Sequence, residues 1–224
     1  MSDSIEAHGD FHFVDSTQNY PVGLRSKRVI DIAFALSGLV LLAPLFLLCY
    51  IAIKLSSPGP VFFGHKRIGF NGKTFGCLKF RTMVPNAEQR LREFLESDPA
   101  ASAEWASCRK LRFDPRITAI GAILRKTSLD ELPQLFNVLA GDMSIVGPRP
   151  VPADELALYR ENARDYLTCR PGITGLWQVS GRSSTTYSRR IAYDTFYSRN
   201  WSLALDTKII VLTLPSLLNS DNVY

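Results

Sequence analysis

The longest apolar stretch of the chain covers residues 32–53, which are 22 residues without a charged side chain. A stretch of this length can cross the hydrocarbon core of a bilayer, so a straight transmembrane helix is the first interpretation. Pro44 lies near its middle, where a proline removes a helical hydrogen bond. Basic residues flank the stretch on both sides, which favours a bent hairpin that enters and leaves by the same membrane face. We predict this bent arrangement, with the straight span as the alternative.

Shorter patterns follow the apolar stretch. Residues 61–83 predict two strands, and the Asn71-Gly72 pair between them is a strong turn signal. The remaining segments have helical spacing, and the expected helices cover 85–111, 117–127, 129–140 (ended by Gly141), 153–170 and 187–218, the last broken at Asn200 and Pro215. The polar segment 85–111 is the expected variable insertion.

Charge is distributed unevenly. The formal net charge is +5, but residues 1–24 contain four acidic residues and no Lys or Arg, so the other 200 residues carry +9. We expect the acidic segment to be a flexible tail, since it has neither the basic start nor the apolar core of a signal peptide. A basic body indicates an anionic partner, which charge alone does not identify as nucleic acid, phosphorylated metabolite or membrane.

Cysteine and histidine usage argues against a soft-metal or redox site. No two of the four cysteines stand close enough for a CxxC motif, and two of the three histidines lie in the acidic tail.

The run from Arg125 to Pro133 allows two interpretations. Ser128 with Glu131 three positions later has the pattern of a capping box, and acidic residues suit the first turn of a helix. Alternatively, the adjacent carboxylates of Asp130 and Glu131, preceded by basic residues, combine a metal ligand with phosphate clamps. Phosphoryl transfer needs little more, and an aspartate can itself attack phosphorus.

Two loops have a composition that suits phosphate binding. The stretch at 141–150 ends with Arg149 between two prolines, which present it on a stiff loop. The stretch at 170–182 is rich in Gly and Arg and contains Trp177, so its backbone could hold phosphates and its indole could stack a base. An ordinary turn and strand is the alternative for this second loop.

Five blocks in order closely resemble the bacterial sugar transferases, also called monotopic phosphoglycosyl transferases. They are Lys27-Arg28, KFRTM at 79–83, DPRIT at 114–118, SLDELPQLFNVLAGDMSIVGPRP at 128–150 and RPGITGLWQVSGR at 170–182. The resemblance runs from Lys27 to the C-terminus. The pattern is nearest to galactose-1-phosphate transferases that initiate exopolysaccharide synthesis.

The resemblance implies roles for individual residues. Asp130 matches the family's nucleophile, and Glu131 matches the carboxylate that supports a Mg²⁺ site together with it. Arg125 and Arg149 match phosphate-binding positions, and we add Arg81 and Arg182 to that predicted set. The family's apolar segment is a re-entrant helix broken at a Ser-Pro pair, which is Ala43-Pro44 here, so the serine hydroxyl is missing.

The expected fold is α/β, mainly α, without a large sheet: a small monotopic membrane domain with a re-entrant helix-break-helix and amphipathic surface helices. The expected divisions are an acidic tail at 1–24, a membrane hairpin at 25–56 and a catalytic domain at 57–224 on the cytoplasmic face of the inner membrane, embedded among its lipids without spanning it.

The expected reaction moves hexose-1-phosphate, galactose or else glucose, from a UDP-hexose to undecaprenyl phosphate and releases UMP. The oligomeric state is left open, a dimer included. A non-catalytic membrane scaffold, with Asp130 and Glu131 as helix caps, is the alternative. Nucleic-acid binding is disfavoured, because the arginines fall in Pro/Gly loops and a long apolar run has no role there.

Overall fold

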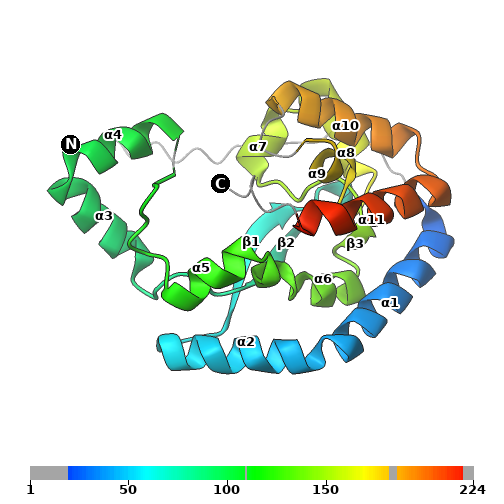
Figure 1. Cartoon of the computed structure of the whole chain (residues 1–224). Helices are drawn as coiled ribbons and strands as arrows, with labels where there is room; N and C mark the ends of the chain where they lie inside the picture. The colour runs from blue at the N-terminus through cyan, green and yellow to red at the C-terminus, as the bar shows by residue number, and fades with distance from the viewer. Residues whose placement is uncertain (1–19, 109, 182–185, 219–224) are drawn as a thin grey trace.

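The computed structural model describes residues 20–108, 110–181 and 186–218, and helices dominate it (Figure 1). The predicted mainly helical α/β class with only small sheets is confirmed. The helices are α1 Leu24–Leu41, α2 Ala43–Ser56, α3 Ala87–Ser97, α4 Pro99–Cys108, α5 Ala119–Lys126, α6 Gln134–Ala140, α7 Ala153–Ala157, α8 Ala163–Leu167, α9 Leu176–Val179, α10 Tyr187–Arg199 and α11 Leu203–Leu218. Four strands form two two-stranded sheets: β1 Phe62–Ile68 with β2 Thr74–Phe80, and β3 Ser144–Val146 with β4 Gly172–Thr174.

The apolar stretch forms the two helices α1 and α2, which meet at Leu42 with a bend of 63°. Within the described residues, no single helix is long and apolar enough to cross a membrane; this bent pair is, by length and composition together. Pro44 stands in the first turn of α2, where a missing N–H costs no helical hydrogen bond. The bend predicted at Ala43-Pro44 is therefore present. It lies at Leu42, the residue just before that pair.

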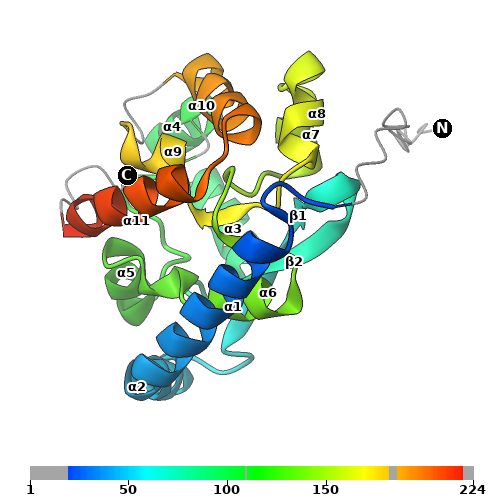
Figure 2. The same cartoon turned by 90° about the vertical axis from the view of Figure 1, so that its right-hand side faces the viewer.

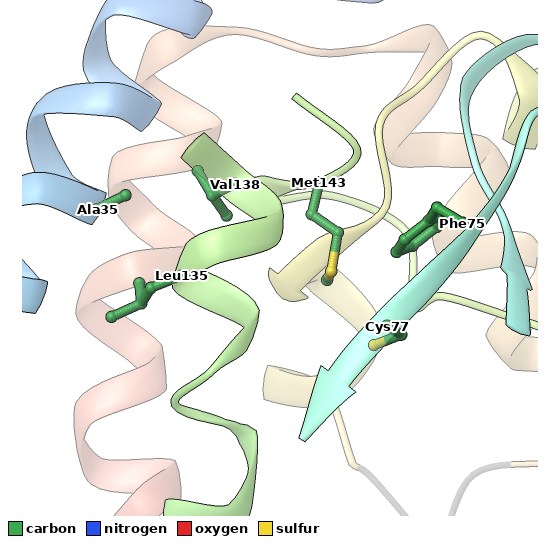
Figure 3. Packing of buried hydrophobic residues seen from close by; sticks show 6 residues of the cluster. All are labelled: Ala35, Phe75, Cys77, Leu135, Val138 and Met143. Atoms are coloured by element: carbon green, nitrogen blue, oxygen red, sulfur yellow. The ribbon is translucent and has the colours of Figure 1, made fainter. Parts of the chain in front are cut away.

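The inner face of α1 packs on α6, which in turn packs on β2 (Figures 2 and 3). The buried cluster that joins them consists of Ala35, Phe75, Cys77, Leu135, Val138 and Met143. The opposite faces of α1 and α2 remain apolar and open, with Val40, Leu41 and Leu55 exposed by 74%, 78% and 84%. A continuous apolar surface of this kind indicates contact with another protein or a membrane.

Polar side chains on consecutive turns of α1 fix it to the rest of the molecule. The Lys27 Nζ lies 2.6 Å from the Asp206 Oδ2 at the start of α11. Arg28 donates to the carbonyl oxygens of Val138 and Leu139, which are among the last carbonyls of α6. The Asp31 Oδ1 accepts hydrogen bonds of 2.9 Å from the Ser144 Oγ and the Ile145 N–H at β3.

The antiparallel β1–β2 hairpin is confirmed, with register from Phe62 opposite Phe80 to Ile68 opposite Thr74. Its turn is a short 3₁₀ segment, η1 Phe70–Gly72, in which Asn71 and Gly72 have φ of 52° and 78°. These left-handed conformations are the reason why an Asn-Gly pair suits this position. The hairpin carries Lys79 towards the segment after α5 and Arg81 towards the end of α2.

The second sheet depends on a close approach of two glycines. β3 and β4 pair in parallel, with Ser144 opposite Gly172 and Val146 opposite Thr174. A Cβ atom on Gly172 would lie 2.1 Å from the Gly147 nitrogen, and one on Gly147 would lie 2.4 Å from the Arg170 oxygen. Only glycine allows the two backbones to come so close, and the loops that follow β3 and β4 are thereby placed side by side.

Three helical expectations need adjustment. The polar segment 85–111 is two helices, because Asp98 ends α3 and its Oδ1 accepts from the N–H groups of Ala100 and Ala101 in α4; this arm stands apart from the body in Figure 1. The segment 153–170 is two short helices with a 3₁₀ turn, η3 Arg160–Asn162, between them. The break at Asn200 is confirmed, but the break predicted at Pro215 is wrong. Pro215 lies in the last turn of α11, exposed, where water can satisfy the carbonyl it leaves unbonded.

We predict that Gly172→Ala lowers the free energy of unfolding by about 1–3 kcal/mol, the range for overpacking a tight site. Gly76→Ala is the matched control, because a Cβ atom there has no neighbour closer than 4.0 Å. Thermal unfolding of both variants in detergent checks this, and equal melting temperatures would contradict the close approach of the two glycines.

Candidate active site

The Asp130-Glu131 pair lies in a 3₁₀ turn, η2 Leu129–Glu131, between α5 and α6. Ser128 precedes it with φ of 57°, and its side chain makes no capping hydrogen bond. The capping box expected from the sequence is therefore absent, because this left-handed turn replaces the ordinary helix start. Gly141 ends α6 with φ of 89°, as predicted. The turn leaves Asp130 buried, with 9% of its surface exposed.

Lys79 is the cation nearest to both carboxylates. Its Nζ lies 2.7 Å from the Glu131 Oε1 and 3.6 Å from the Asp130 Oδ2. The sequence showed Lys79 within the KFRTM block but gave no reason to assign it a role. The available signal was its register in the predicted strand: Lys79 shares a face with Phe75 and Cys77, which are both buried, and an unpaired charge on that face would be unfavourable.

Burial and neighbouring charges act on Asp130 in opposite directions. Burial raises the pKa of its carboxyl above the usual range, and the negative charge of Glu131 raises it further, while Lys79 and Arg125 lower it. The pKa of the Arg125 guanidinium is lowered by burial, with Asp130 acting against that shift. Two cations thus favour an ionised carboxylate at a position where burial opposes it.

Arg125 is positioned by the KFRTM block. Its Nε donates to the Thr82 Oγ1 at 2.9 Å, and the Thr82 carbonyl oxygen accepts from the Thr118 N–H at the start of α5. A Cβ on Gly121 would lie 2.0 Å from that same oxygen, so this glycine lets α5 pack directly on the strand end. Packing between segments far apart in the sequence therefore positions Arg125, and its charge and that of Asp130 act on each other.

Two other predicted arginines lie elsewhere. The guanidinium of Arg81 donates to the carbonyl oxygens of Ser57 and Pro58 at 2.7 and 2.9 Å, and to the Ser57 Oγ at 2.9 Å. These bonds tie the end of α2 to β2 and favour a structural role, so phosphate binding by Arg81 stays a prediction. Arg182 lies outside the described residues.

Arg149 lies in a cluster of cationic and aromatic side chains. Its Cζ lies 5.5 Å from the centroid of the Trp177 ring, and the Arg190 Cζ lies 5.1 Å from the same ring. Arg190, in α10, also pairs with the Glu155 Oε2 at 3.2 Å. The RPGITGLWQVSGR block thus contains strand β4, as the alternative of an ordinary turn and strand predicted. Its indole then lies against Arg149.

The carboxylate pair and the arginine cluster are neighbours. Burial raises the pKa of the Cys77 thiol, and the charges that modify it include Lys79 and Glu131 from one group and Arg149 from the other. Arg67 in β1 belongs to the second group: burial lowers the pKa of its guanidinium, and Arg149 lowers it further. The two groups thus place two carboxylates and an excess of positive charge around Cys77, an arrangement suited to a polyanionic substrate.

A metal site made by the protein alone is not found: among the described residues, no group of three or more His, Cys, Asp and Glu side chains could hold an ion. Mg²⁺ is usually bound by one or two carboxylates together with water and substrate phosphates. Asp130 and Glu131 fit that smaller requirement, so they could hold Mg²⁺ when a phosphorylated substrate is bound.

Comparisons with known proteins identify the family of the chain. Residues 22–220 match the family model described as bacterial sugar transferase. The exopolysaccharide production protein ExoY of Sinorhizobium fredii is 53% identical over 91% of this chain and 90% of its own length. The undecaprenyl-phosphate galactose phosphotransferase of Salmonella typhimurium is 49% identical over 88% of this chain and 41% of its own length. A UDP-glucose:undecaprenyl-phosphate glucose-1-phosphate transferase of Caulobacter vibrioides is 44% identical over 88% and 72%.

We predict that Asp130→Asn leaves the fold intact and is at least as stable as the unmodified protein at neutral pH. Because the folded-state pKa of Asp130 is raised, its ionisation costs stability as the pH rises from the unfolded-state value through the folded one. The higher free energy of unfolding of the Asn variant should therefore be seen at pH 7 and disappear in acid, where Asp130 is protonated in both states. Melting temperatures across pH 4–8 measure it, and a variant much less stable at pH 7 would contradict the balance described for Asp130.

Proposed function

The chain belongs to the bacterial sugar transferase family, and on this basis we propose how it transfers a sugar-1-phosphate to undecaprenyl phosphate. Relatives that share about half of its sequence over about nine-tenths of the chain are named for exopolysaccharide production and for this lipid-linked transfer. It is an undecaprenyl-phosphate sugar-1-phosphate transferase that acts at the start of exopolysaccharide synthesis. The single observation that carries the mechanism is a buried carboxylate, Asp130, beside Glu131, Lys79 and Arg125.

In the first half-reaction, an oxygen of the Asp130 carboxylate attacks the β-phosphorus of a UDP-hexose. The new oxygen–phosphorus bond gives an aspartyl-phosphosugar, while the bond between the β-phosphorus and the bridging oxygen breaks and UMP leaves. In the second, an oxygen of undecaprenyl phosphate attacks the same phosphorus, the bond to Asp130 breaks, and undecaprenyl-diphospho-hexose leaves. Asp130 is regenerated as a carboxylate, so no other reactant is consumed.

The neighbouring cations have distinct tasks in this scheme. Lys79 and Arg125 favour the ionised form of Asp130, which is the form that attacks. Arg149, on the stiff loop after β3, binds phosphate oxygens of the nucleotide. Glu131 holds Lys79 at 2.7 Å and keeps it beside the nucleophile.

Asp130 and Glu131 would hold Mg²⁺ against the diphosphate of the bound substrate. A bound Mg²⁺ supplies positive charge to phosphate oxygens and to the leaving group. Lys79 already neutralises one of the two negative charges of these carboxylates. Binding of a divalent cation would therefore need the additional negative charge of the substrate phosphates.

We further propose that residues 25–56 enter the membrane without crossing it, and that residues 57–224 act at the cytoplasmic face. The 63° bend, the basic flanks and the exposed apolar faces of α1 and α2 support this. UDP-sugars are made in the cytosol, whereas undecaprenyl phosphate presents its phosphate at the bilayer surface. The re-entrant pair would keep Asp130 where both can reach it.

The hexose is galactose or, as second candidate, glucose, because the relatives named above include both kinds of transferase. The deciding experiment incubates the purified protein with undecaprenyl phosphate and a panel of UDP-sugars, and measures UMP release and the lipid product. UDP-galactose should give the highest rate. Release of UMP from none of the panel would contradict the proposed function.

We predict that Asp130→Asn and Asp130→Ala reduce transfer by about three orders of magnitude or more, since loss of a covalent nucleophile is among the largest effects of a point mutation. Glu96→Gln, a matched loss of a carboxylate at the exposed end of α3, is the control and should retain activity. The assay is UMP release with the best UDP-sugar. A rate for the Asn variant within tenfold of the unmodified protein would exclude Asp130 as nucleophile.

We predict that removal of divalent cations abolishes transfer and that Mg²⁺ restores it. The carboxylate and phosphate oxygens of the proposed site are ligands for hard cations. The measurement is the rate after treatment with EDTA, before and after Mg²⁺ in excess is added. Full activity in EDTA would contradict the metal proposal and leave the nucleophile untouched.

A further inference from the structure

Arg190 is a buried cation that the proposed mechanism does not use. It lies in α10 with 8% of its surface exposed, and its guanidinium stacks on the rings of Trp177 and Tyr187 at 5.1 and 5.2 Å. A buried guanidinium is costly unless its nitrogens are bonded. Within the described part of the chain, Arg190 forms one ion pair, with Glu155, whose side chain is 38% exposed.

The hydrogen bonding of Arg190 is incomplete. Its Nε and Nη2 atoms are buried and have no partner within the described residues. In this same protein, Arg116 and Arg199 use that edge of the guanidinium to hold both oxygens of a carboxylate, those of Asp114 and Asp165. Arg190 therefore does not have the bonding that would make it a strong contributor to stability, and its position calls for another explanation.

The Trp177 ring supplies that explanation, because it lies against both Arg190 and Arg149. Trp177 is in the short helix α9, and its Nε1 is also buried without a partner within the described residues. The described residues supply no hydrogen bond to this indole, and the two cations lie against its ring. Cation–π contacts of this kind are attractive, and they strengthen when the cation is shielded from water.

We propose that Arg190 is a positioning residue for substrate phosphate binding: through the Trp177 ring it holds Arg149 in the orientation that binds a phosphate. This inference rests on the proposed function, since it takes Arg149 as the phosphate ligand. The chain of contacts runs from Glu155 to Arg190, then to Trp177 and Arg149. Arg190 is too deeply buried to touch the substrate itself, so its effect is on the geometry of Arg149.

A double-mutant cycle on ligand binding tests this. UMP is titrated by calorimetry onto protein that carries Asp130→Asn, so that no turnover occurs. Arg149→Ala and Arg190→Met should each weaken UMP binding, by about tenfold if 1.4 kcal/mol of binding energy depends on the orientation of Arg149. In the Arg149→Ala background, Arg190→Met should have an effect below twofold, because the group it positions is gone. Additive effects of the two substitutions would overturn the proposal.

Two further variants separate positioning from folding. Arg189→Met changes the exposed neighbour on α10 and should leave both UMP affinity and melting temperature unchanged. Arg190→Lys keeps the charge without the planar stacking group and should restore the melting temperature if the Met variant unfolds, while UMP binding remains weakened. Restoration of UMP affinity by lysine would show that charge alone suffices, and would overturn the role of the Trp177 stack.

Failure of this inference can be told apart from failure of the proposed function. If the unmodified protein releases UMP from a UDP-sugar but the cycle is additive, only the role of Arg190 is wrong. If UMP is neither released nor bound by the unmodified protein, the proposed function itself fails.

Discussion

The attachment of α1 to the rest of the molecule is the interaction on which the other features depend. Three polar side chains hold this mostly apolar helix. Lys27 pairs with Asp206, Arg28 donates to carbonyl oxygens of α6, and Asp31 accepts hydrogen bonds from β3. Loss of one partner from a buried ion pair costs about 3–5 kcal/mol, and each of these polar groups meets its partner at one position along α1. The polar contacts therefore define the rotation and depth of α1, and the same elements, α6 and β3, lead directly to the candidate active site.

That site resolves a conflict between burial and charge. A nucleophilic carboxylate must be ionised, but an ionised carboxylate in a buried turn is unfavourable unless cations are close. Lys79 and Arg125 provide them, and each is delivered by a different segment: Lys79 by the end of β2, and Arg125 by α5, which packs on the strand end through Gly121. Positive charge is in excess around Arg149, and the negative charge of a bound diphosphate would neutralise it.

Local features of the sequence predicted local structure well. The Asn71-Gly72 turn, the bend at Pro44, the end of α6 at Gly141 and the adjacency of Arg125 to Asp130 all follow from residue conformational preferences or from short spacing. What was missed depends on contacts across the chain. Lys79 meets Glu131 across 52 positions, and Arg190 meets Trp177 only because α9 and α10 pack together. The capping box failed because Ser128 adopts a left-handed conformation, which its residue type does not favour.

For a bent pair that enters the membrane as proposed, the bonds of Arg81 to Ser57 and Pro58 matter for the surrounding lipid. They attach the far end of the pair to the folded body, as Lys27, Arg28 and Asp31 attach its beginning. A helix anchored at one end can adjust to a thinner or thicker bilayer by changing its tilt. A pair anchored at both ends to one folded body lacks that freedom, so hydrophobic mismatch must be taken up by deformation of the surrounding lipid. The bilayer would adapt to this protein, rather than the reverse.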